Sequence, residues 1–485
     1  MLKTGFPTKA VLLLAALAAS LVALGTRWGI GLTTDSISYL QMAEDIRAGK
    51  LILSTSTWPP LYPASLALVG GGFQHYASVR LLSLALTGTN VFLFAALLFR
   101  LTGGSRLFTL AGTTLAALSL VLLETHTAAW SEPLFLCLLF SSTGALALYL
   151  EHPKPRHAVL ACVFLSLIPL TRYVGIVFVL AGCLLVLLKG QRNLTQRLAF
   201  CFFSGLPISA LLMWNRLSRG TSTGGSSWNP SWPGAEISAG ISVVAAWLVP
   251  GIDRYRVLPL QSLIAGLIFF AWMYFLVHSF RRFPEVLNSD LAKTISIFAL
   301  FYPAFLLATI GLSRHDVPMD QRLLCPVHFF ALLLTVAFLA RYAERDPAKA
   351  RPAKIVMAGW LLLYALPAAY GTHFLFKYGR GYLGPNYQAP EIYSALTKMS
   401  PQSIRTNDGA AARIWLDLKT EHMSGEPASP LLFFRVEHPL PPNNEASFKR
   451  DLVPEEYLDK LIRETPMELK LKEGKVELYL PIAKD

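Results

Sequence analysis

Residues 10–40 read AVLLLAALAASLVALGTRWGIGLTTDSISYL, an apolar run followed directly by a polar loop with one carboxylate, Asp35. The apolar part is long enough to cross a bilayer as a single helix. Ile37, Leu40 and Ala43 follow at near-helical spacing, so we expect Asp35 at the start of an amphipathic helix beside a membrane face. Polar groups in such places are costly and mark functional sites. Asp35 is therefore the first candidate for chemistry in this chain.

The rest of the chain continues the apolar pattern. Of its 485 residues, 53% are hydrophobic and 15% are charged, and the mean hydropathy is +0.46. We identify about eleven apolar runs of spanning length, which predict an α-helical polytopic membrane protein. The pair of runs around Thr171–Tyr173 is either two short spans or one long bent element. The runs lie near 10–27, 76–99, 107–123, 133–150, 158–171, 174–188, 198–214, 259–279, 293–312, 323–340 and 355–375.

The chain divides into a membrane part, 1–375, and a polar tail, 376–485. The tail alternates short helical and strand patterns, which predicts a small α/β domain outside the membrane. Glu473-Gly474 separates the last two strand patterns and indicates a hairpin. We expect helices near 390–398, 409–416 and 455–464, and strands near 403–406, 431–436, 467–471 and 475–480.

The orientation follows from the distribution of Lys and Arg. Loops around Arg100, Arg192 and Arg281 are short and densely basic, which places them in the cytoplasm. The alternate loops are longer and carry acids such as Asp35 and Glu124. We therefore expect a multi-pass protein of a bacterial-type inner membrane, with a cytoplasmic N-terminus and a periplasmic or extracellular tail. The basic residues flank spans and form no nucleic-acid-binding motif.

Carboxylates, an imidazole and aromatic rings gather on the predicted outer loops. Tyr39 and the rigid segment Trp58-Pro59-Pro60-Leu61-Tyr62-Pro63 make either a stiff turn or a surface for a sugar or lipid. Glu124, His126 and Glu132 share the next outer loop. Their alternatives are a solvated loop for Glu124 and His126, and a favourable contact with a helix N-terminus for Glu132.

Asp35 also has two interpretations. It could simply cap the helix that it precedes. Alternatively, its carboxylate could accept a proton or bind a divalent cation, with Glu124 as a second ligand. These interpretations are compatible with one another.

Arginines on the outer side are candidates for binding an anion. Arg172-Tyr173 lies between two apolar runs, where an arginine either reaches back to the interface or faces a polar cavity. Arg314-His315 and Arg322 flank another outer turn, as local ion pairs or as a phosphate clamp. The clamp is chemically suitable because guanidinium groups match phosphate oxygens. A lipid phosphate is the ligand that such residues would suit.

Four segments, in this order, resemble those of bacterial GT-C glycosyltransferases, more narrowly the family 39-like relatives that include protein mannosyltransferases and aminoarabinose transferases. They are DSISY followed by PPLYP within 35–63, WSEPLF at 130–135, LTRYVG at 170–175 and DQRLLCP at 320–326. Many members have two adjacent acids in the first loop. In this chain Ser36 follows Asp35, so a second acid would come from elsewhere, such as Glu124.

The resemblance implies transfer of a sugar from a polyprenyl-phosphate-linked donor to an extracytoplasmic acceptor (a lipid, glycan or protein), with inversion at the anomeric carbon. Asp35 would be the base or orient the acceptor, and Glu124 and His126 would assist it. Asp35 and Glu124 could instead hold Mg²⁺ or Mn²⁺. The substrate-binding residues would be Tyr39, Trp58, Tyr62, Glu132, Arg172, Tyr173, Arg314, His315 and Arg322, with the arginines on the lipid phosphate.

Two other functions fit parts of the pattern. A flippase or transporter for a lipid-linked glycan would need polar groups along its spans, whereas here they gather on the outer face. A glycan ligase would use a diphosphate-linked lipid donor and would also have external arginines. The one-sided arrangement favours an enzyme.

Overall fold

The structure is a computed structural model of the chain. It describes residues 5–50, 58–73, 75–190, 192–223, 232–250, 258–312, 319–399, 404–406, 409–416, 430–434 and 467–481.

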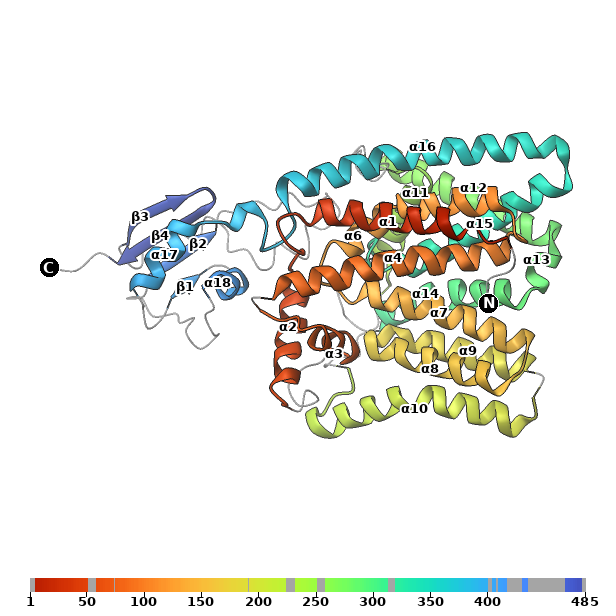
Figure 1. The fold of residues 1–485 in the computed structure, drawn as a ribbon, viewed down its shortest axis with the longest axis horizontal. Helices are drawn as coiled ribbons and strands as arrows, with labels where there is room; N and C mark the ends of the chain where they lie inside the picture. The colour runs from red at the N-terminus through yellow and green to blue at the C-terminus, as the bar shows by residue number, and fades with distance from the viewer. Residues whose placement is uncertain are drawn as a thin grey trace.

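Long apolar helices run alongside one another in one bundle (Figure 1). Eight described helices are long and apolar enough to cross a membrane, and α5 (Arg106–Ala117) with α6 (Leu120–His126) makes a ninth if this pair, bent by 49°, is one span. The predicted apolar runs fall on helices, with 107–123 divided between α5 and α6, and the multi-pass helical fold is confirmed. The runs at 158–171 and 174–188 fall on helices shorter than the candidate spans, so fewer than the eleven predicted spans are found among the described residues. The eight are α1 (Thr8–Gly25), α4 (Tyr76–Leu101), α7 (Glu132–Glu151), α10 (Leu194–Arg219), α12 (Leu258–Arg282), α14 (Asp290–Leu312), α15 (Cys325–Arg345) and α16 (Pro347–Tyr378).

The runs around Thr171–Tyr173 form two antiparallel helices and not one bent element. Helix α8 (Pro155–Thr171) ends at Arg172, whose extended backbone (φ −150°, ψ 130°) reverses the chain into the short 3-10 helix η2 (Tyr173–Gly175) and α9 (Ile176–Lys189). At the far end of this hairpin, Arg192 Nε donates to the Pro153 carbonyl over 2.9 Å. The turn therefore places Arg172 at one end of the bundle.

Helix α15 is the centre of the bundle. Its spanning segment is 83% buried, whereas those of α10 and α12 are 28% and 17% buried. Phe329 of this helix packs edge to face against Phe94 and Phe140, which also pack against each other, with ring centroids 5.7 to 6.2 Å apart. Such aromatic packing fixes neighbouring helices relative to one another. The shorter α11 (Gly234–Leu248) and α13 (Pro284–Asn288) lie beside this core.

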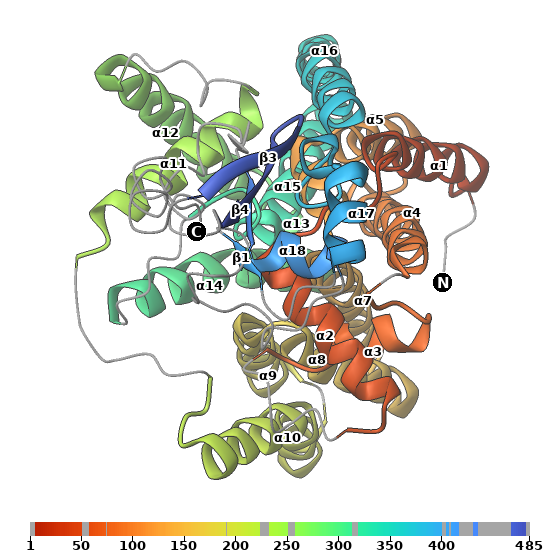
Figure 2. The ribbon, with the colours of Figure 1, turned by 90° about the vertical axis from the view of Figure 1, so that its left-hand side faces the viewer.

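Two short helices, α2 (Thr34–Arg47) and α3 (Leu61–Leu68), cross the end of the bundle that faces the tail (Figure 1). The N-terminus lies toward the opposite end of the bundle. Figure 2 views the bundle from the end that faces the tail and shows the tail elements in front of the helices. The polar loops that connect the spans at this end therefore converge beneath the tail.

The tail contains the predicted mixture of helices and strands. After the 3-10 helix η4 (Pro385–Tyr387), a sheet of order β1-β2-β4-β3 packs with two helices. Strands β1 and β2 are parallel, and the other pairs are antiparallel. The predicted helix near 455–464 lies outside the described residues. The elements are α17 (Pro390–Met399), β1 (Arg405–Thr406), α18 (Gly409–Leu416), β2 (Leu431–Phe434), β3 (Met467–Glu473) and β4 (Val476–Pro481).

The tail and the first loop share one apolar cluster. Leu32, Tyr39 and Tyr62 from the first loop and its helices belong to the same buried cluster as Tyr387 and Phe434 from the tail. Burial of this apolar surface stabilises the contact between the two parts. The tail is therefore packed on the end of the bundle where α2, α3 and the polar loops lie, which we call the polar end.

Backbone bridges tie three distant segments together at this contact. Gly31 pairs with Ala128, and Leu32 pairs with Gly381, both as isolated parallel bridges. Gly381 has φ +63°, and a Cβ at this position would lie 1.9 Å from the Leu32 oxygen. Only glycine fits there, because its missing side chain permits both the backbone angle and the close approach.

We predict that Gly381→Ala destabilises the contact between tail and bundle, whereas Gly474→Ala is mild. Gly474 has a similar φ of +59°, but nothing lies within 4 Å of its Cβ position. Both variants incur the cost of a left-handed alanine, about 1–2 kcal/mol, and only Gly381→Ala adds a steric clash. Thermal unfolding in detergent measures both. Equal effects would contradict the close approach at Gly381.

Candidate functional site

The start of α2 presents Asp35 to the interior of the polar end. Thr33 is the N-cap residue, with an extended backbone (φ −129°, ψ 176°), and its N–H donates to Ser36 Oγ over 3.1 Å. Asp35 lies one residue inside the helix and does not cap it. The capping interpretation of Asp35 is therefore wrong, because Thr33 and Ser36 provide the cap. The Asp35 carboxylate is left to make a tertiary contact.

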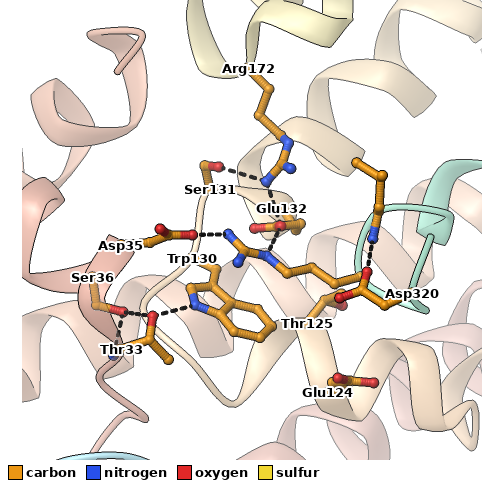
Figure 3. Close-up of polar contacts among 12 residues, drawn as sticks. Thr33, Asp35, Ser36, Glu124, Thr125, Trp130, Ser131, Glu132, Arg172 and Asp320 are labelled. Atoms are coloured by element: carbon orange, nitrogen blue, oxygen red, sulfur yellow. Dashed lines mark hydrogen bonds and ion pairs between the residues drawn. The ribbon is translucent and has the colours of Figure 1, made fainter. Parts of the chain in front are cut away.

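Asp35 is one member of a chain of ion pairs that also contains Glu132 and two arginines (Figure 3). A terminal nitrogen of Arg322 lies 2.7 Å from Asp35 Oδ2, and Arg322 Nε donates to Glu132 Oε1. Arg172 donates to the same Glu132 oxygen and, over 3.2 Å, to Ser131 Oγ. The structure thus brings together Asp35, Glu132, Arg172 and Arg322, four residues that the sequence had singled out.

Glu132 is the most deeply buried member of this chain, with 1% of its surface exposed. It occupies the first turn of α7, where the helix dipole also favours a negative charge. Its second oxygen, Oε2, has no hydrogen-bond partner among the described residues. A carboxylate in this environment depends on its two arginines, because an unpaired buried charge is strongly destabilising.

We predict that Glu132→Gln lowers the free energy of unfolding by about 3–5 kcal/mol, the usual cost of breaking a buried ion pair. The matched control is Glu151→Gln at the other end of α7. Glu151 pairs with Arg100 over 2.7 Å, and both side chains are more than 25% exposed. Loss of such a pair costs about 0–1 kcal/mol. Chemical or thermal unfolding of purified protein compares them, and similar losses would contradict the structural role of Glu132.

Arg322 carries a stable positive charge. Burial alone would lower the pKa of Arg322, but the neighbouring carboxylates of Glu132 and Asp35 outweigh it and raise the pKa above its usual value. Asp320 lies two residues before Arg322, and its Oδ1 accepts a hydrogen bond from the Leu323 N–H over 2.7 Å. Burial raises the pKa of Asp320 above its usual value. The guanidinium is therefore held in place as a permanent cation at the polar end.

Trp130 and Arg380 also belong to the site, although the sequence did not identify them as site residues. The guanidinium carbons of Arg322 and Arg380 lie 4.0 and 4.4 Å from the centroid of the Trp130 ring. The indole nitrogen donates to Thr33 Oγ1 over 2.9 Å. Trp130 thus connects the cap of α2 to both arginines. The only sequence signal for Arg380 was its position between two glycines just after the last span.

Glu124 and His126 are placed apart from the Asp35 ion pairs. Glu124 interacts with Arg380, which donates to its backbone carbonyl and lies 3.8 Å from its Oε1. His126 is 0% exposed. Its Nε2 accepts from the Asn90 amide over 2.9 Å, and its Nδ1 lies 3.0 Å from the Leu122 carbonyl. The structure does not bring the His126 ring to Asp35, and its contacts are those of a structural residue in the bundle.

The three predicted aromatic rings pack together beside Asp35, but Tyr39 and Tyr62 are 1% and 4% exposed and belong to the buried cluster shared with the tail. The ring of Tyr39 packs edge to face against Trp58 and Tyr62, with centroids 5.4 and 5.1 Å apart. Its hydroxyl lies 3.4 Å from Ser131 Oγ. Burial, followed by the charge of Asp35, raises the pKa of Tyr39 to about 12, so the phenol stays neutral. Of these three rings, Trp58 is the exposed one, with 36% of its surface accessible.

Tyr173, another predicted site residue, contacts a different part of the bundle. The Tyr173 hydroxyl accepts from Asn215 Nδ2 over 2.9 Å, which ties η2 to α10. Arg314 and His315 lie outside the described residues. The structure therefore supports two of the three predicted arginines as neighbours.

The residues expected to hold a divalent metal do not fit that role in the described part of the chain. Mg²⁺ and Mn²⁺ need several oxygen ligands directed at one point. Asp35 and Glu124 are instead paired with different arginines, Arg322 and Arg380. Within the described ranges, no group of three His, Cys, Asp or Glu side chains is placed to hold an ion.

No family model matches the chain, and no curated protein matches it in sequence. Several solved structures are similar to it, among them these two. ArnT from Cupriavidus metallidurans, crystallised bound to undecaprenyl phosphate, has a TM-score of 0.54 and 14% sequence identity, over 98% of this chain and 99% of that one. An Archaeoglobus fulgidus oligosaccharyltransferase tethered with an acceptor peptide has a TM-score of 0.48 and 15% identity, over 87% of this chain and 60% of that one.

The likeness to ArnT covers the bundle and the tail alike, since it spans 98% of this chain. At this level of identity, similarity shows a common fold. The order of four sequence segments and the arrangement of the helices lead to the same result. The chain therefore has the same fold as ArnT, a GT-C-type fold of membrane-embedded helices.

Proposed function

We propose that this protein is a membrane glycosyltransferase that moves a sugar from a polyprenyl-phosphate-linked donor to an acceptor outside the cytoplasm, with inversion. The observation that carries the proposal is the convergence of Asp35, Arg322 and Arg172 at one end of the bundle. A carboxylate beside two buried guanidinium groups combines the two chemical functions that such a transfer needs. The similar ArnT structure contains undecaprenyl phosphate, a lipid of the proposed class.

The reaction is a single displacement at the anomeric carbon. The acceptor hydroxyl oxygen forms a bond to this carbon while the bond from carbon to phosphate oxygen breaks. The hydroxyl proton passes to the Asp35 carboxylate, which acts as general base. The leaving polyprenyl phosphate gains negative charge, and Arg322 and Arg172 stabilise it. Attack from the face opposite the leaving group gives inversion.

The exposed aromatic ring of Trp58 supports the sugar-binding part of the proposal. Tyr39, Trp58 and Tyr62 pack against one another directly beside Asp35. Aromatic rings provide an apolar face and, through Tyr hydroxyls, a polar edge. We assign the exposed ring of Trp58, which packs against the buried ring of Tyr39, to the sugar or to the first isoprene units of the donor. No step is assigned to a metal, because Asp35 and Glu124 are each paired with an arginine.

The proposed orientation places this polar end outside the cytoplasm. The basic loops lie at the other end of the spans, as the positive-inside rule requires of cytoplasmic loops. The donor is a lipid, so its phosphate would reach the site from the outer leaflet. The tail, which packs over the first loop, would then lie in the periplasm or outside the cell.

We expect Asp35→Asn to lower sugar transfer by about 10²-fold or more, the range for loss of a general base. Asp45→Asn is the matched control, because Asp45 lies on the same helix and pairs with Lys50 over 3.1 Å, away from the arginines. Native membranes with equal expression would be supplied with radiolabelled polyprenyl-phosphate-sugars and, in parallel, diphosphate-linked donors.

Transfer by wild type and Asp45→Asn alone would agree with the proposal. Undiminished transfer by Asp35→Asn would remove Asp35 from the reaction. Transfer only from diphosphate-linked donors would identify a glycan ligase instead. Movement of the intact donor across the membrane, without transfer, would identify a flippase.

A further inference from the structure

The two arginines of the proposed phosphate site are already neutralised by protein carboxylates. Arg172 and Arg322 carry two positive charges, and Asp35 and Glu132 carry two negative charges in direct contact with them. The cluster is mostly buried, with side-chain exposed fractions of 18% and 19% for the arginines. A phosphate that entered this neutral cluster would find no uncompensated guanidinium. One of the carboxylates must therefore lose its ion pair with an arginine before a phosphate can bind that arginine.

Glu132 cannot readily be the one that moves. It is 1% exposed and holds both arginines through one oxygen. Moving it would leave Arg172 without a carboxylate in contact, at the cost of an uncompensated buried charge. Asp35 is different, because its side chain is 24% exposed and it contacts Arg322 at one terminal nitrogen only. Arg322 would remain paired with Glu132 if Asp35 left.

We propose that Asp35 and the donor phosphate compete for Arg322, so that protonation of Asp35 during transfer releases this arginine to the departing lipid phosphate. The inference rests on the proposed function. The donor is a phosphodiester with one negative charge, and the product lipid phosphate gains a second. The acceptor proton moves to Asp35 in the same step and removes its charge. The total charge around Arg322 therefore stays constant while its partner changes.

This exchange gives Asp35 a second role besides that of a base. Before the reaction, its ion pair orients the carboxylate and keeps Arg322 in place. After the reaction, the neutral carboxyl is a weaker partner for Arg322 than a phosphate oxygen, because protonation removes the attraction between opposite charges while the phosphate keeps its charge. Asp35 thus couples proton transfer to stabilisation of the leaving group.

The test is equilibrium binding of undecaprenyl phosphate to the purified full-length protein, which requires no sugar and no turnover. Asp35→Asn imitates the protonated carboxyl, so we expect its Kd to be at least about tenfold lower than that of wild type. Asp35→Ala, which removes the competitor altogether, should tighten binding at least as much. Asp45→Asn should bind like wild type. Undecaprenol, which lacks the phosphate, should bind all four proteins equally.

The outcomes separate this inference from the proposed function. Equal or weaker binding of undecaprenyl phosphate by both Asp35 variants, with measurable binding by wild type, would overturn the competition and leave the phosphate site intact. Absence of phosphate-dependent binding in every protein would overturn both. Unfolding profiles of the Asp35 variants would show that they are folded, as expected when Arg322 keeps its contact with Glu132.

Discussion

The polar end of this bundle depends on one buried carboxylate. Glu132 is almost fully shielded from solvent and accepts from both Arg172 and Arg322. Because a buried charge needs its partners, the turn between α8 and η2 and the loop before α15 are drawn to the start of α7. Asp35 joins the same chain through Arg322. Four segments that are distant in sequence are thereby held in one arrangement that suits phosphate and proton chemistry.

Backbone contacts and stacking make this arrangement more rigid. The bridges of Gly31 with Ala128 and of Leu32 with Gly381 fix the segments that lead to Asp35 and to Glu132. The Trp130 ring contacts the guanidinium groups of both Arg322 and Arg380, and its indole N–H donates to the cap residue Thr33. Since Gly381 follows directly on Arg380, the tail takes part in building the site. A site held on several elements in this way is well suited to keep charged groups in place.

Sequence reasoning found part of this site because certain residue types are costly at a membrane face. Asp35, Glu132, Arg172 and Arg322 all stand out in this way, and all four meet in the structure. His126 stood out for the same reason, yet it is a buried residue whose ring hydrogen-bonds to the Asn90 amide nitrogen and to the Leu122 carbonyl. Arg380 was missed because its partners, Trp130 and Glu124, lie more than two hundred residues away in sequence.

The sequence by itself determined the helical membrane fold, the positions of its spans and the mixture of helices and strands in the tail. These follow from local properties, namely the length of apolar runs and the period of alternation. Only the tertiary structure decided which polar groups meet, because ion pairs such as that of Asp35 with Arg322 join loops whose order in space is set by helix packing. It also decided that the carboxylates expected to hold a metal are each bound to an arginine.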